Sequence, residues 1–446
     1  MTILHRALPT LVALTLLASF ASAQLSTTKA GRSPVNLSGS GTVTQILDEE
    51  TIAAVIPGVS IMRIERVAAN PDGDLILFLI VFPFPATLAH WDMETQTLTP
   101  ILDVDDLGTV VGMASGFDAR VYALDVAPNG DIYLLASDSP GANPNPTKHV
   151  VQVPLVGAAP GGYGAPVSLT SFESVWTWSD SNMRVNGAGE IEMIIDEGTV
   201  AGDAAPLGLG SGLFRWIPGV STVNLPLFSF WDFGNRQTDG GPSLTADANA
   251  DDFGISNMAA AGNRLFFTCA ATHDTFKEPN FDTTFGESYD GDILTLDLTT
   301  GQLEMLISRP DYLAKTDPLG YDFGDQDPTR DIESIVLAVD EARDRLYTFE
   351  HTSTPSVASH KHGVLAQWNA STGRFEGVVA TMFDFLEFWE ADGEEAVGAT
   401  FPGGEVHGPF CREGGIDVLP DGSIVLRMWV ATLGQSRVLR VVPGDL

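Results

Sequence analysis

The sequence has few basic residues for its length. Only 23 Lys and Arg stand against 58 Asp and Glu in 446 residues, and the net charge at pH 7 is −35. Nucleic acids and anionic membrane surfaces also carry negative charge, so they would be repelled by such a chain. The composition therefore excludes nucleic acid as a partner and favours solubility in water and the binding of cations.

Cysteines and catalytic signature motifs are also scarce. The only two cysteines are Cys269 and Cys411. In an exported protein they are compatible with one disulfide or with two free thiols. The sequence contains no G-x-S-x-G nucleophile motif, no P-loop, no HExxH and no CxxC. No motif therefore supports serine-hydrolase, nucleotide-phosphate, zinc-protease or dithiol chemistry.

Long hydrophobic runs are missing as well. The N-terminus has one basic residue, Arg6, then an apolar run over 11–20 and the small residues Ala21-Ser22-Ala23. This order is typical of a secretory signal peptide, and the run is too short to span a bilayer. We expect residues 1–23 to be removed and residues 24–446 to be secreted or periplasmic, without membrane insertion.

What the sequence does contain is a repeated β-hairpin pattern. The clearest copies are "LDVAPNGDIYLLA" (124–136) and "IDVLPDGSIVLRM" (416–428), and four others lie at 66–79, 183–195, 257–269 and 335–349. Each copy has an apolar strand, a Gly- or Asp-rich turn and a second strand. Gly, Asn and Asp supply the positive φ that tight hairpin turns require.

A second hairpin follows most copies, for example at 88–102, 212–227, 292–307 and 364–379. Repeats of four strands with little helical pattern are typical of propeller blades. We therefore predict an all-β, six-bladed β-propeller over residues 24–446, with 24–40 as a flexible N-terminal segment. A β-sandwich would explain the strands but not the regular copies, and a seventh blade within a long insertion remains an alternative.

The two ends of the chain predict how the ring closes. The sixth copy supplies two strands and then 437–443, so its blade lacks a fourth strand. Residues 41–47, "GTVTQIL", read as a strand without a partner at the other end of the chain. If this strand completes the last blade, no sheet edge is left open.

The long connections are expected at one end of the propeller, which we call the top. They are 103–120, 196–211, 232–253, 270–290, 308–330 and 383–413. Several are acidic and aromatic, such as 230–241, 321–331 and 382–395, and the last is compatible with a short amphipathic helix. Long loops on a rigid scaffold are where binding and catalysis concentrate. We expect a small molecule, a glycan or a partner protein to bind there.

Polar residues in the innermost strands form the candidate metal site. The set is Glu65, Asp125, Asn257, Glu333 and Asp417, with Arg66, Asn182 and Arg184 as alternatives that depend on strand register. We expect them at the start of each inner strand, at the channel mouth, where they converge on the propeller axis, and a group of hard oxygen ligands suits Ca²⁺. The sequence is equally compatible with a water-filled channel lined by hydrogen-bonded polar groups.

Two histidines are candidates for a general base. His351 ends a predicted strand and His407 lies in the next top connection. Imidazole titrates near neutral pH, so either could move a proton beside a bound metal. The alternative is that both are ordinary surface histidines in loops.

The repeats resemble the six-bladed calcium-propeller superfamily, which includes gluconolactonase-like and paraoxonase-like enzymes and related NHL-type propellers. The segments that carry the resemblance are 124–136 and 416–428, and residues 330–351 look like a strand of phytase-like esterase propellers. The resemblance implies an axial Ca²⁺ held by Asp125, Asn257, Glu333 and Asp417. The chain departs from the lactonases in its longer blades and in Gly414-Gly415, where an Asn-Gly pair is expected.

Two functions follow from these features. The first is a non-catalytic exported propeller that binds a ligand or partner at its acidic, aromatic top. The alternative is a Ca²⁺-dependent lactone or ester hydrolase, in which the metal polarises a carbonyl and a carboxylate or histidine activates water. A quinone-dependent sugar dehydrogenase would need a stacking tryptophan and a basic cluster, and the low Lys and Arg content argues against it.

Overall fold

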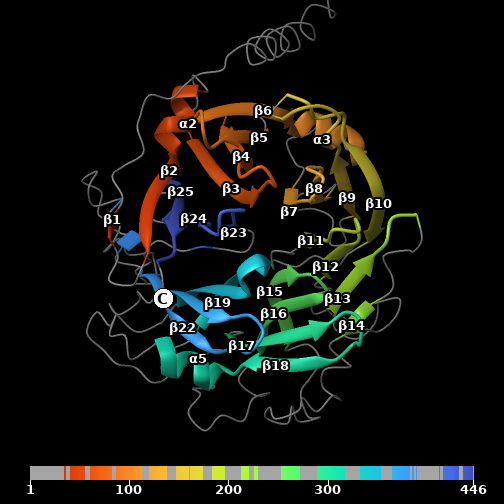
Figure 1. Cartoon of the computed structure of the whole chain (residues 1–446). Coiled ribbons are helices and arrows are strands. Elements are labelled where there is room, and N and C mark those ends of the chain that lie inside the picture. Colours follow the sequence, from red (N-terminus) through yellow and green to blue (C-terminus); the bar gives the residue numbers. More distant parts are fainter. Residues whose placement is uncertain are drawn as a thin grey trace, which may run out of the picture.

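The structure is a computed structural model. The residues it describes are 35–36, 41–55, 61–82, 87–112, 120–137, 147–159, 161–173, 183–195, 212–219, 226–229, 253–271, 289–316, 332–352, 364–381, 384–385, 388, 411, 415–430 and 435–444. These residues form six antiparallel sheets arranged in a ring, as Figure 1 shows. The six-bladed β-propeller predicted from the repeats is confirmed.

Each of the first five blades is a four-stranded meander that runs outward from the axis. Blade 1 comprises β3 (Ile61–Ala69), β4 (Leu75–Phe82), β5 (Thr87–Asp92) and β6 (Thr97–Asp103). Blade 2 comprises β7 (Arg120–Val126), β8 (Ile132–Ser137), β9 (Thr147–Val153) and β10 (Val167–Glu173). Blade 3 comprises β11 (Met183–Val185), β12 (Ile191–Ile195), β13 (Gly212–Trp216) and β14 (Pro226–Ser229).

The next two blades repeat this order. Blade 4 comprises β15 (Phe253–Ala261), β16 (Arg264–Ala271), β17 (Tyr289–Asp297) and β18 (Leu303–Ile307). Blade 5 comprises β19 (Ile332–Asp340), β20 (Arg345–Thr352), β21 (Val364–Asn369) and β22 (Phe375–Thr381). All six hairpins identified in the sequence coincide with the two innermost strands of a blade.

Blade 6 is built from both ends of the chain. Its strands β23 (Ile416–Val418), β24 (Ile424–Val430) and β25 (Gln435–Val442) come from the C-terminus. The fourth strand is β2 (Thr42–Asp48), which pairs antiparallel with β25 in a register that places Val43 opposite Val441. The predicted closure by the N-terminal strand is therefore confirmed. A fifth strand, β1 (Val35–Asn36), pairs with β2 within the segment predicted to be flexible.

The α-helices in the described part of the chain are short and lie in the connections between blades. They are α2 (Glu49–Val55), α3 (Val104–Val110) and α5 (Arg309–Thr316), and the sequence pattern did not predict them. Residues 384, 385 and 388 are helical, within the segment 382–395 where a short helix was considered. No helix in the described part of the chain is long and apolar enough to cross a membrane.

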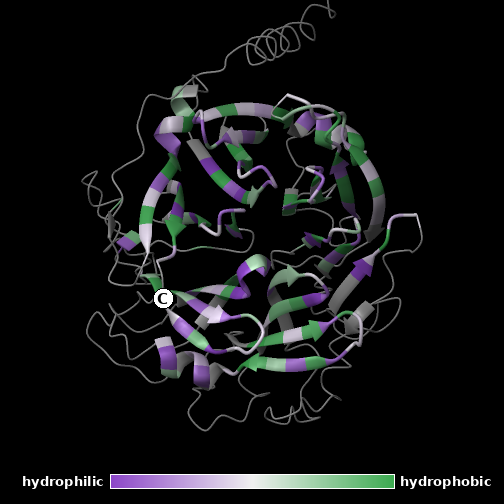
Figure 2. Ribbon diagram, in the orientation of Figure 1, coloured by the Kyte–Doolittle hydropathy of each residue, from purple (hydrophilic) through white to green (hydrophobic). Residues whose placement is uncertain are grey.

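The hydrophobic core is divided into layers, each shared by two neighbouring blades. One layer packs Leu47 of blade 6 against Trp91 of blade 1, and another packs Phe349 of blade 5 against Leu426 of blade 6. Figure 2 shows hydrophobic and hydrophilic stretches alternating along the strands, as expected when successive side chains point to opposite faces. Each blade is therefore stabilised mainly by contact with its neighbours.

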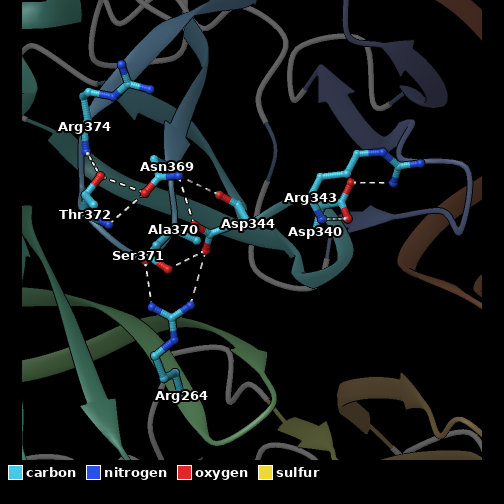
Figure 3. A network of polar contacts seen from close by, with 9 residues as sticks. All are labelled: Arg264, Asp340, Arg343, Asp344, Asn369, Ala370, Ser371, Thr372 and Arg374. Carbon is cyan, nitrogen blue, oxygen red and sulfur yellow. Dashed lines mark hydrogen bonds and ion pairs between the residues drawn. The ribbon is translucent and has the colours of Figure 1, made fainter.

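Adjacent hairpin turns are joined at the end of the propeller opposite the top. Arg264 of blade 4 donates to the Ala370 carbonyl at 3.2 Å and to Asp344 at 3.4 Å, both in blade 5 (Figure 3). Asp344, at φ 53°, also accepts from Ser371 at 2.7 Å. Arg343 of blade 5 then donates to the Asp421 carbonyl of blade 6 at 2.9 Å. This end of blades 4, 5 and 6 is a continuous polar network.

The closing strand gives the first test. Leu47 is buried between blades 6 and 1, so Leu47→Ala should lower the free energy of unfolding by about 2–5 kcal/mol, because it removes contacts and leaves a cavity. Thr44→Ala, a change on the same strand at a half-buried position, serves as the control. Chemical denaturation measures both. Equal effects of the two substitutions would contradict closure of the core by β2.

Candidate functional site

Two inner-strand acids join neighbouring blades. Asp125 and Asp417 each stand one residue before the end of their strand, beside the hairpin turn. The backbone N–H of Val185 in blade 3 donates to Asp125 Oδ2 at 2.6 Å. The N–H of Ala69 in blade 1 donates to Asp417 Oδ2 at 2.9 Å. Each carboxylate thus links the innermost strand of its own blade to that of the next blade.

An arginine supplies positive charge between these acids. Arg184 Nη1 lies 3.1 Å from Asp125 Oδ1. Burial raises the pKa of Asp125 to about 6, the Arg184 charge opposes that rise, and the Asp417 charge adds to it. Against the opposing effect of burial, the charges of Asp125 and Asp417 raise the pKa of Arg184. We call Asp125, Arg184 and Asp417 the axial cluster.

The charges continue from the axial cluster into blade 3. Glu192, fully buried on β12, pairs in register with Arg184 on one side and Arg215 on the other. Arg215 Nη2 lies 3.0 Å from Glu192 Oε1, and Asn186 donates to the same oxygen at 3.2 Å. Burial raises the pKa of Glu192 to about 7 despite Arg215. Positive and negative groups therefore alternate across the inner three strands of this blade.

The structure does not bring all the predicted ligands to one level. Asp125 and Asp417 lie beside the hairpin turns, at the end opposite the predicted channel mouth. For Asp125 the reason is that β7 begins at Arg120, earlier than the repeat pattern indicated. Glu65 and Asn257 each stand four residues before the end of their strands, and Glu333 stands seven before the end of β19. At about 3.3 Å per residue, these offsets separate Asp125 from Glu65 and Asn257 by roughly 10 Å along the strands.

The metal site consequently stays a prediction. Asn257 is buried, and the side chain of Glu333 lies outside the described residues. Among the residues that the structure describes, no group of three or more His, Cys, Asp or Glu has the arrangement of a metal site. Of the five predicted ligands, Asp125 and Asp417 interact electrostatically with each other, and both interact with Arg184.

The candidate general bases also remain predictions. His351 is the second-last residue of β20 and pairs in register with Ser334. Its side chain and the whole of His407 lie outside the described residues. Cys411 is buried between blades 5 and 6 and is not part of a disulfide, so the predicted alternative of a Cys269–Cys411 disulfide is not formed.

Glu65 belongs to a second charged group, which the sequence did not reveal. Arg63 Nε lies 2.7 Å from Glu65 Oε1, and the Arg63 guanidinium stacks over Trp429 at 4.4 Å. Arg427 of blade 6 is buried and donates from Nε to the Ile64 carbonyl at 2.7 Å. Its signal in the sequence is one charged residue within the apolar run "SIVLRMWV" (423–430).

Comparisons with known proteins add little to this description. No protein-family model matches the sequence, and no curated protein is significantly similar to it. Among solved structures, the allergen Mala s 1 of Malassezia sympodialis is 8% identical with a TM-score of 0.41, covering 86% of this chain and 94% of its own. TolB from Acinetobacter baumannii is 11% identical with a TM-score of 0.35, covering 92% and 79%. Similarity at this level says nothing about activity.

The inter-blade bond of Asp417 gives a stability test. Asp417→Ala should lower the free energy of unfolding by about 1–3 kcal/mol, because the Ala69 N–H loses its acceptor. Asp417→Asn should cost less, because its amide oxygen can still accept. Asp72→Ala, an exposed change in the turn of blade 1, is the control. Equal losses of melting temperature in Asp72→Ala and Asp417→Ala would refute a stabilising role of the hydrogen bond between Ala69 and Asp417.

The raised pKa values predict a pH dependence of stability. The pKa of Asp125 rises from 3.8 to about 6, and that of Glu192 from 4.5 to about 7. At pH values between the unfolded and the folded pKa, each carboxyl group is protonated in the folded state and ionised in the unfolded chain. The contribution of these two protonated groups to stability therefore grows as pH falls and is lost as pH rises. The melting temperature should therefore increase from pH 8 to pH 5.5.

The variants Asp125→Asn and Glu192→Gln isolate this contribution. Each should reduce the increase in melting temperature, while the background effect of the net charge of −35 acts on all proteins alike. The expected difference is roughly 1–3 kcal/mol per carboxyl group, since one pKa unit corresponds to about 1.4 kcal/mol. Parallel pH profiles for the wild type and both variants would contradict the prediction.

Proposed function

We propose that the protein is an exported binding protein, and that the top of its propeller receives a ligand or partner. The observation that carries this proposal is the contrast between its two ends. All hairpin turns between the first and second strands of a blade span at most five residues. The turns of blades 4 and 5 are tied together (Figure 3), and Arg343 ties blade 5 to blade 6. The connections longer than 15 residues leave from the other end, whereas the longest connection at the hairpin-turn end is 154–166.

The chemistry of these connections supports binding rather than a defined reaction. Segments 230–241, 321–331 and 382–395 combine acidic residues with Phe, Tyr and Trp. Aromatic side chains supply a large apolar contact area, and carboxylates accept hydrogen bonds from hydroxyl or amino groups. The acids of the axial cluster already accept hydrogen bonds from backbone amides of neighbouring blades, which favours a structural role for them.

The binding proposal is tested with arrays of oligosaccharides and basic peptides. Labelled mature protein should bind a defined class on the array, and Trp389→Ala or Trp231→Ala should weaken that binding roughly tenfold or more, as expected for an aromatic anchor. Arg374→Ala, an exposed change at the hairpin-turn end, should bind like the wild type. Absence of binding, or equal loss in all three variants, would refute the proposal.

The alternative, a Ca²⁺-dependent lactonase or esterase, rests on the resemblance to calcium propellers. If the predicted ligands hold an ion, Ca²⁺ at 100 times its Kd should stabilise the chelator-treated protein by about 2.7 kcal/mol. Glu333→Gln should abolish that stabilisation, and Asp72→Asn should leave it unchanged. A melting temperature that is the same with and without Ca²⁺ would rule out the metal site and this form of the hydrolase.

A further inference from the structure

The layer between β3 and β24 holds an unusual excess of positive charge. Along β24, Val425 faces the core shared with blade 1, so Arg427, two residues later, lies on the same face. Opposite it, β3 contributes Arg63 and Arg66, with Glu65 between them. Arg66 and Arg427 are buried and Arg63 is half-buried, in a protein with only 23 Lys and Arg.

Among the described residues, the carboxylate paired with Arg427 is distant. The Arg427 side chain is 1% exposed, and Glu65 Oε2 lies 3.9 Å from its Nη2. Nη2 is buried and has no hydrogen-bond partner within this part of the chain. Burial lowers the pKa of Arg427 to about 10, and the charges of Arg66 and Arg63 lower it further against the effect of Glu65. Burying a guanidinium with so loose a partner is costly.

Glu65 is shared unequally between its two partners. It contacts Arg63 closely, at 2.7 Å, and Arg427 only loosely, at 3.9 Å. Its side chain is 17% exposed, and that of Arg63 is 34% exposed. The group therefore reaches the surface on the side of Arg63 and Glu65, while Arg427 lies at its inner end.

We propose that this group is a binding site for a small carboxylate, and that Glu65 holds the place of the ligand next to Arg427. The Nε of Arg427 is held by the Ile64 carbonyl, and its buried Nη2 has no acceptor among the described residues, which leaves Nη2 as the donor for a ligand oxygen. A carboxylate oxygen accepts a strong, charge-assisted hydrogen bond from such a donor. Entry of the ligand displaces Glu65 toward Arg63, and binding involves no covalent step.

The displacement of Glu65 predicts opposite effects of two substitutions. Glu65→Gln removes the competing negative charge, so acetate should bind roughly tenfold tighter than to the wild type, as expected for relief of a like-charge contact. Arg427→Met should abolish acetate binding while the fold is retained, because a buried charge is often replaced by an apolar side chain without loss of stability. Arg427→Lys should bind acetate weakly, since a flexible ammonium is not held in place as the guanidinium is by the Ile64 carbonyl.

The experiment compares melting temperatures of the full mature protein in sodium acetate and in sodium chloride at equal ionic strength and pH 7.5. Glu65→Gln should melt lower than the wild type in chloride, because Arg427 then has no carboxylate nearby, and acetate should restore it. Arg427→Met should show no difference between the two salts. Glu376→Gln is the matched control, because Glu376 also pairs with an arginine, Arg374, at 3.2 Å.

Titration calorimetry with acetate and sulfate then identifies the anion class. Tighter acetate binding by Glu65→Gln than by the wild type and Glu376→Gln supports the proposal. It is overturned if acetate acts equally on Glu65→Gln and Arg427→Met, or if sulfate stabilises the protein and acetate does not. The site lies within the blades and does not depend on the top connections, so this outcome is independent of the array experiment.

Discussion

The sharing of each hydrophobic layer by two blades is the constraint on which the rest of this structure depends. A single four-stranded sheet has two faces to cover, and no blade here covers its own faces. Every blade must therefore have a neighbour on both sides, and the first and last blades must meet. Pairing of β2 with β25 meets this requirement, because the N-terminal strand completes blade 6, whose other strands come from the C-terminal segment.

Ring closure brings the inner strands together at the axis, where polar groups lose contact with water. A carboxylate there must find donors, and Asp125 and Asp417 find them in the backbone of the next blade. Arg184 then offsets part of their charge. The axial cluster is therefore explained by the packing of the ring, and the same residues need no bound ion to satisfy both oxygens of each carboxylate.

The fold could be predicted from the sequence because hairpin turns depend on local chemistry. Gly73, Gly130, Gly189, Gly262 and Gly422 all have positive φ in the structure, and each marks the inner hairpin of a blade. The position of an inner-strand residue along the propeller axis could not be predicted in the same way. Asn257 and Asp125 each stand five residues before their turn glycine. The turn of blade 4 spans two residues and that of blade 2 spans five, so Asn257 lies four residues from the end of its strand and Asp125 only one.

The same limit applies to the charged partners of Arg184 and Arg427, which the sequence does not predict. A periodic pattern tells which face of a strand a side chain occupies, but not which charge it meets on the neighbouring blade. Arg427 and Glu65 are 362 positions apart in the chain and meet only because blade 6 lies next to blade 1. A single arginine in an apolar strand is costly wherever the ring places it. Its presence therefore points to a compensating group, and Glu65 at 3.9 Å compensates it only in part.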